Sequence, residues 1–144
     1  MKIALGSDHA GWEVKEKICA FLVQKGYEII DYGTQSQDSC DYPDFAIAVA
    51  QSVSQGTASM GILLCGSGIG MSIAANKVKG IRAALCVNEE MAKLSRLHNN
   101  ANVLCLGVRT FPGNWEQIVD IWLNTKFEEG RHQKRIDKIH HIEV

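Results

Sequence analysis

The chain has 144 residues, 46% of them apolar, and a formal net charge of −1 at pH 7. This length predicts one domain over residues 1–144 with its own core, and the near-neutral charge argues against a nucleic-acid partner. No apolar run approaches the roughly 20 residues that span a bilayer, which argues against a membrane partner. The N-terminus enters a strand-like pattern without a secretory signal, so we expect a cytoplasmic protein.

Short apolar runs alternate along the chain with amphipathic segments of helical length. The runs predict strands at Ile3 to Gly6, Glu28 to Tyr32, Gly61 to Cys65, Arg82 to Val87, and Val103 to Gly107. Helical spacing predicts helices over Val14 to Leu22, after Pro43, from Met71 to Asn76, over Glu89 to Leu97, and over Trp115 to Trp122. This alternation predicts an α/β fold: a doubly wound, Rossmann-like sheet of five parallel strands with helices on both faces and a C-terminal helix.

The five cysteines include no Cys-x-x-Cys pair and are odd in number, so free thiols in a reducing compartment fit best. Cys86 and Cys105 lie in apolar runs, where small buried residues are the expected interpretation. Cys65 differs because it leads into the segment Gly66-Ser-Gly-Ile-Gly70, which a helix follows. Backbone amides of such a loop and the helix N-terminus favour a bound anion, so Cys65 would stand beside an anion hole.

Three other classes of protein could use a glycine loop in this fold. A dinucleotide-binding fingerprint would require Gly or Ala where this chain has Met71. A P-loop would require Lys-Ser/Thr after the glycines, and neither glycine-containing loop of this chain has it. A phosphorylation-receiver module would carry an aspartate at the position of Cys65 and paired acids where only Asp8 stands. None of the three patterns is complete.

Ligands of doubly wound sheets bind beyond the carboxyl ends of the strands. Asp8 and His9 follow the first strand, the Cys65 loop follows the third, and Arg109 follows the fifth. The helix after the fourth strand ends at His98-Asn99, and we expect all four groups at one edge. Arg131 and Arg135 are spaced to share one helix face, either as a solvated basic surface or as a fork on a phosphate. A phosphate monoester would suit this excess of donors.

Several motifs, in order along the whole chain, resemble ribose-5-phosphate isomerase type B. They are Gly6-Ser-Asp-His-Ala-Gly11, Asp41-Tyr-Pro43, Cys65-Gly-Ser-Gly-Ile-Gly70, Ser72-Ile-Ala-Ala-Asn-Lys77, Gly80-Ile-Arg82, Ser95-Arg-Leu-His-Asn99 and Gly130-Arg-His-Gln-Lys-Arg135. The resemblance implies a small α/β homodimer that interconverts ribose 5-phosphate and ribulose 5-phosphate without a metal or other cofactor. It also implies that the partner subunit completes each site.

The resemblance further implies roles for individual residues. Cys65 matches the base that removes the carbon-2 proton, and a methionine, Met71, stands where some relatives carry a glutamate base. His98 matches the residue that opens the furanose ring, and His132 would assist. The enediolate would be held by the Ser67 hydroxyl and the loop amides of Gly66, Ser67, Gly68, Ile69 and Gly70. Asp8 and Asn99 match groups that bind sugar hydroxyls, Tyr42 lines the site, and the phosphate contacts match His9, Arg109, Arg131 and Arg135.

Other readings stay open within this resemblance. Relatives of the same fold isomerise six-carbon sugar phosphates such as allose 6-phosphate and galactose 6-phosphate, and a sugar-phosphate binding module without activity is a further alternative. Galactose-type enzymes pair two different subunits, whereas this chain has both Cys65 and His98, which favours a self-sufficient homodimer. Assembly into a tetramer is left open.

Overall fold

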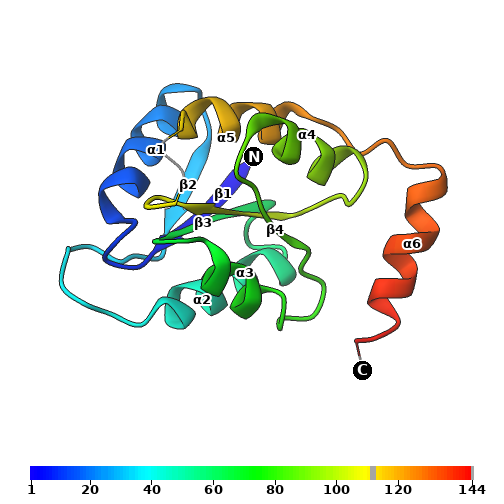
Figure 1. Cartoon of the computed structure of the whole chain (residues 1–144), viewed down its shortest axis with the longest axis horizontal. Coiled ribbons are helices and arrows are strands. Elements are labelled where there is room, and N and C mark those ends of the chain that lie inside the picture. Colours follow the sequence, from blue (N-terminus) through cyan, green and yellow to red (C-terminus); the bar gives the residue numbers. More distant parts are fainter. Residues whose placement is uncertain (111–112, 144) are drawn as a thin grey trace.

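A computed structural model describes residues 1–110 and 113–143, and its described strands form one parallel sheet (Figure 1). The strands are β1 (Lys2–Ser7), β2 (Glu28–Asp31), β3 (Met60–Cys65), β4 (Ala83–Leu85) and β5 (Val103–Gly107), in the spatial order β2-β1-β3-β5-β4. This confirms the predicted doubly wound sheet. β4 is shorter than predicted, and the Asn88 side chain caps the next helix by accepting from the Met91 N–H.

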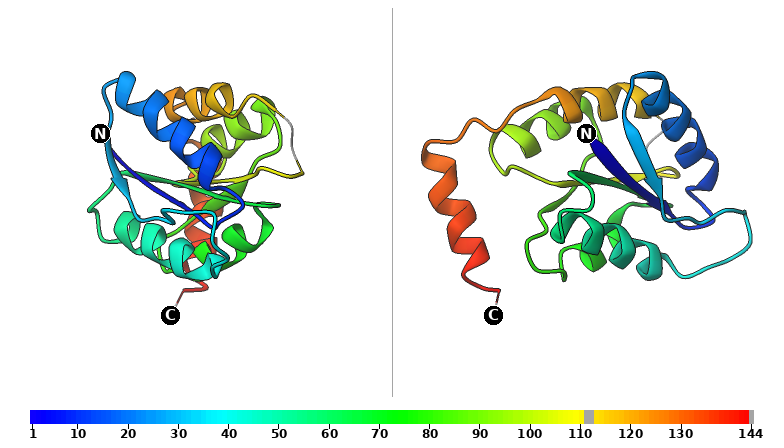
Figure 2. Two further views of the ribbon diagram at one scale, coloured as in Figure 1. Left: turned by 90° about the vertical axis from the view of Figure 1, so that its left-hand side faces the viewer. Right: turned by 180° about the vertical axis from the view of Figure 1, so that it is seen from behind.

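The helices cover both faces of the sheet (Figure 2). One face carries α1 (Trp12–Gln24), α4 (Glu89–Leu97) and α5 (Trp115–Asn124), and the other carries α2 (Tyr42–Ser54) and α3 (Ile69–Ala75). Successive residues of a strand point to opposite faces, and β3 shows this: Ile62 and Leu64 pack under α1, α4 and α5, whereas Leu63 and Cys65 pack under α2 and α3. Cys86 and Cys105 are buried, as predicted, and Trp122 is buried as well.

The chain reverses its direction of winding at β1. β2 pairs with one side of β1, and β3 pairs with the other side. The carboxyl ends of β1 and β3 therefore flank a switch point, where loops diverge and leave room for a ligand. No helix among the described residues has the length and apolar character to cross a membrane.

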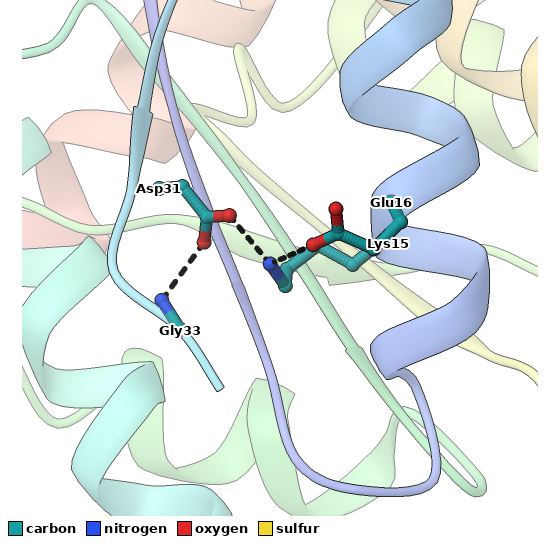
Figure 3. A network of polar contacts seen from close by, with 4 residues as sticks. All are labelled: Lys15, Glu16, Asp31 and Gly33. Atoms are coloured by element: carbon teal, nitrogen blue, oxygen red, sulfur yellow. Dashed lines mark hydrogen bonds and ion pairs between the residues drawn. The ribbon is translucent and has the colours of Figure 1, made fainter. Parts of the chain in front are cut away.

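A buried ion pair ties α1 to the end of β2 (Figure 3). The side chain of Lys15 is fully buried, and its Nζ lies 2.6 Å from Asp31 Oδ2 and 2.9 Å from Glu16 Oε1. Asp31 Oδ1 accepts a hydrogen bond from the Gly33 N–H at 2.8 Å. The Gly33 carbonyl in turn accepts from the Ser7 N–H at 2.7 Å, so the network reaches the end of β1.

The last helix, α6 (Arg131–His140), stands off from the rest of the molecule (Figures 1 and 2). Near its C-terminal end, the Glu143 carboxylate accepts from the Gly80 N–H at 3.0 and 3.1 Å. Arg82 Nη1 also lies 2.9 Å from His140 Nε2. Both contacts lie just before β4, so α6 is fastened at the amino edge of the sheet.

Candidate active site

The strand register brings three loops together at the carboxyl edge. Ser7 pairs with Leu64, and Cys65 pairs with Gly107. Asp8, the Cys65 loop and Arg109 therefore follow directly from neighbouring strands, as predicted. Together with Tyr42 at the start of α2, the loops form a cavity of about 430 Å³ lined by Asp8, Tyr42, Cys65, Gly66, Ser67, Ile69, Gly70 and Ile73.

Cys65 ends β3 with 5% of its surface exposed. Its Sγ accepts a hydrogen bond from the Gly68 N–H at 3.1 Å. Gly68 has a φ of +77°, and an added Cβ would lie 2.5 Å from Leu85 Cδ1 and 3.0 Å from the Leu106 carbonyl carbon. Only glycine allows this turn, which directs an amide at the sulfur. The thiol and the loop amides therefore face the same small space.

The other buried thiols are unsuited to proton transfer. Burial raises the pKa of the Cys86 thiol to about 11 and raises the pKa of Cys105 as well. Both thiols therefore stay protonated at neutral pH. Met71 is fully buried in the same apolar cluster as Cys65, so its side chain packs in the core.

Hydrogen bonds to the backbone fix the side chains around Cys65. Asp8 is buried, and its Oδ1 accepts from the Gly11 N–H at 3.1 Å. His9 Nδ1 accepts from the Cys40 N–H at 3.2 Å, which leaves the proton of a neutral ring on Nε2. Ser67 Oγ accepts from the Ile69 N–H at 3.2 Å, at the start of α3. The Tyr42 ring lies against Gly70, where an added Cβ would be 2.5 Å from the ring.

The Arg109 side chain is the exposed cation of this group. Its backbone N–H donates to the Gly66 carbonyl at 2.9 Å, which holds the end of β5 against the Cys65 loop. A Cβ added to Gly66 would lie 3.6 Å from Arg109 Nη1, so the guanidinium passes beside the glycine loop. The carboxyl edge thus combines a thiol, a buried carboxylate, backbone amides and a cation.

The expectation that His98 and Asn99 lie at this edge is wrong. A helix that leaves the carboxyl end of β4 runs back along the sheet, so α4 ends at the amino edge. His98 is the C-cap residue of α4 at that edge. Two residues later, the Asn100 carbonyl accepts a hydrogen bond from Arg82 Nε at 3.0 Å. Asn99 lines a separate cavity with Ile81, Arg82 and Ala83.

The predicted residues of α6 join His98 rather than Cys65. The His98 and His132 rings are stacked, with centroids 4.4 Å apart and planes 18° from parallel. Arg131 and Arg135 are exposed and one turn apart on the predicted helix. Within one chain, the expected site residues therefore form two groups at opposite edges of the sheet. One group follows β1, β3 and β5, and the other lies at the end of α4 and on α6 (Figure 1).

Glu128 completes the second group, and the sequence analysis missed it. It lies four residues before His132, in the non-helical segment between α5 and α6. Ligand atoms of His98, Glu128 and His132 lie within 4.8 Å of one another, a set that matches metal-ligating residue types. The Glu128 oxygens lie 4.0 Å from His98 Nε2 and 3.8 Å from His132 Nε2, beyond hydrogen-bonding distance.

Almost the whole chain matches one known protein family. Residues 3–139 match the model of the ribose/galactose isomerase family. The chain belongs to this family. It is 49% identical to ribose-5-phosphate isomerase B of Escherichia coli over 143 residues, which cover 99% of this chain and 96% of that protein.

Solved structures of family members agree with the fold. Ribose-5-phosphate isomerase B of Clostridium thermocellum superposes with a TM-score of 0.98 at 52% identity, over 99% of this chain and 97% of that one. The enzyme of Mycoplasma genitalium with bound ribulose 5-phosphate superposes with a TM-score of 0.94 at 46% identity, over 99% of this chain and 95% of that one. The fold that separates the two groups of residues is therefore the fold of this family.

Proposed function

We propose that this protein is an aldose–ketose isomerase that interconverts D-ribose 5-phosphate and D-ribulose 5-phosphate. The observation that carries the proposal is the Cys65 thiol, which shares a cavity with the loop amides and the buried Asp8 carboxylate. Membership of the ribose/galactose isomerase family and the similarity to ribose-5-phosphate isomerases B support the substrate class.

Isomerisation requires two proton transfers at neighbouring carbons. The Cys65 sulfur removes the carbon-2 proton of the open-chain aldose, and the carbon-1 carbonyl oxygen becomes the enediolate oxyanion. The proton is then returned to carbon 1, while the proton of the carbon-2 hydroxyl moves to the oxygen on carbon 1 and a carbonyl forms at carbon 2. Negative charge develops on oxygen at the midpoint. The Gly68 N–H donates to the sulfur, and Gly66, Ser67, Ile69 and Gly70 line the same cavity. These loop amides and the Ser67 hydroxyl can stabilise the charge. Each step moves a proton, which these groups can do without a cofactor.

Ribose 5-phosphate exists mainly as a furanose, so the ring must open first. We assign this step to His98, which would protonate the ring oxygen while the carbon-1 hydroxyl returns a proton to the enzyme. Because His98 lies at the edge opposite Cys65, the His98 that acts at a given Cys65 would come from the partner subunit of a homodimer. A two-fold dimer then has two equivalent sites.

The same arrangement divides the proposed substrate contacts. His9, Arg109, Asp8 and Tyr42 would come from the subunit that provides Cys65. Asn99, Arg131, His132 and Arg135 would come from the partner subunit. Two arginines one helical turn apart match the fork geometry that binds a phosphate monoester. Exposed apolar side chains at the rim of the Cys65 cavity, Ile69 and Ile73, support burial by a partner.

The proposal is tested on purified protein treated with a chelator. We expect turnover of ribose 5-phosphate in excess of turnover of allose 6-phosphate, and Cys65→Ala should lower kcat by at least about 1,000-fold. Cys19→Ala, which alters a half-buried thiol on α1, is the matched control and should keep normal turnover. Near-normal activity in Cys65→Ala would remove Cys65 as the base, and a preference for allose 6-phosphate would reassign the substrate.

A further inference from the structure

Glu128 lies in the segment between α5 and α6, and a backbone hydrogen bond fixes its position. Its N–H donates to the Leu97 carbonyl at 3.1 Å, one residue before His98. The end of α4 and the start of α6 are thereby joined at this residue. The position of the Glu128 side chain beside the two histidines follows from this backbone contact.

The Glu128 carboxylate faces both histidines, one with each oxygen. Oε2 lies 4.0 Å from His98 Nε2, and Oε1 lies 3.8 Å from His132 Nε2. The His132 side chain is buried, and among the described residues its Nε2 has no hydrogen-bond partner. An unsatisfied buried nitrogen is costly, and the half-exposed Glu128 side chain is free to make the movement of roughly 1 Å that a hydrogen bond requires.

We propose that Glu128 is a positioning residue for ring opening, which holds His98 and its stacked neighbour His132 as one unit. This inference rests on the proposed isomerase function and extends it to a residue with no assigned role. Because Nε2 of His98 faces the carboxylate, Nδ1 is the ring nitrogen directed away from it. Nδ1 is therefore the atom that can reach a furanose ring in the site of the partner subunit.

The surroundings of His132 disfavour its charged form. Burial, followed by Arg131, His98 and Arg135, lowers the pKa of His132, and the Glu128 carboxylate opposes this shift. The His132 imidazole is therefore neutral at neutral pH. During ring opening the carbon-1 to O4 bond breaks, O4 gains a proton from His98, and the carbon-1 hydroxyl loses one as its oxygen becomes the carbonyl. The protonation of the enzyme is then unchanged overall.

The test compares Glu128→Gln with Glu129→Gln, which alters the neighbouring exposed carboxylate. We expect Glu128→Gln to lower kcat for ribose 5-phosphate by at least about 10-fold with KM changed less than about 2-fold. Exchange of the carbon-1 hydrogen of ribulose 5-phosphate with deuterated water should be unaffected, because the open-chain ketose needs no ring opening. Glu128→Asp, which keeps the charge on a shorter side chain, should recover part of kcat.

A spectroscopic measurement separates this role from a structural one. Removal of the carboxylate should lower the pKa of the His132 imidazole, and NMR titration of the whole protein measures this shift. Unchanged titration, unchanged kcat, or equal losses in turnover and hydrogen exchange would overturn the proposal for Glu128. An inactive wild-type protein would instead overturn the isomerase function, and the role of Glu128 with it.

Discussion

Lys15 shows how a single residue can constrain the frame that supports the site. Its ammonium group is fully buried between Asp31 and Glu16, and Asp31 also accepts the Gly33 N–H. Removing Asp31 would leave the buried Lys15 charge without its partner, which is costly. Removing Lys15 would leave no buried charge, because Asp31 is partly exposed. The two partners of this pair should therefore differ in their contributions to stability.

We predict that Asp31→Ala destabilises the protein by about 3 kcal/mol and that Lys15→Met destabilises it by clearly less. In Lys15→Met the carboxylate of Asp31 keeps its Gly33 hydrogen bond and is partly exposed to water. Urea unfolding measures both free energies. Glu16→Gln, at the half-exposed partner, serves as the control with a loss below about 1 kcal/mol. A larger loss in Lys15→Met than in Asp31→Ala would contradict the argument.

The residue scale also shows what local sequence can predict. Cys65 was predicted as a site residue because glycines and a helix start follow it within five positions. Apolar runs likewise predicted that Cys86 and Cys105 are buried. Asp31 pairs with Lys15 from another element, 16 residues further along the chain. Glu128 lies beside His98 although 30 residues separate them in the sequence. Such pairs depend on how the elements pack, which spacing along the chain does not specify.

At the scale of elements, the strands and helices were predicted well because their apolar periodicities are clear. The edge at which His98 lies was predicted wrongly, although the rule that decides it is elementary. In a parallel sheet a helix runs antiparallel to the strand before it, so its last residues lie at the amino edge. Residues after a strand and residues at the end of the next helix therefore belong to opposite edges.

Arg82 links the two segments of the second group. Its Nε donates to the Asn100 carbonyl, next to His98 and Asn99, and its Nη1 contacts His140 on α6. Burial lowers the pKa of Arg82, and the nearby Glu143 carboxylate opposes this shift. The guanidinium thus holds the turn after α4 and the end of α6 in one arrangement.

We predict that Arg82→Gln loosens α6 and weakens substrate binding more than it slows turnover. Because Arg131 and Arg135 lie on α6, KM for ribose 5-phosphate should rise by about 10-fold, the effect of losing one charge-assisted hydrogen bond. Amide hydrogen exchange of residues 131–140 should become faster in the same variant. Lys138→Gln, an exposed cation on α6, should change neither quantity. Faster amide exchange with an unchanged KM would show that α6 does not contribute to phosphate binding.

At the scale of the whole molecule, the distance between the two groups has a direct consequence. The elements that position Cys65 lie at the carboxyl edge, and those that position His98 lie at the amino edge (Figure 1). Neither edge of a single chain has both the Cys65 thiol and the His98 imidazole. If each site takes one group from each subunit, two different inactive variants can repair one another in a mixed dimer.

We predict such complementation between Cys65→Ala and His98→Ala. In a mixed dimer one site receives Cys65 from the His98→Ala chain and His98 from the Cys65→Ala chain, and the other site lacks both. Random pairing makes half of the dimers mixed, so co-expressed or co-refolded variants should reach about a quarter of wild-type activity. A mixture of Cys65→Ala and Cys65→Ser, which are altered in the same group, should stay inactive. If Cys65 and His98 acted within one chain, the first mixture would stay inactive as well, because neither chain could contribute an intact pair.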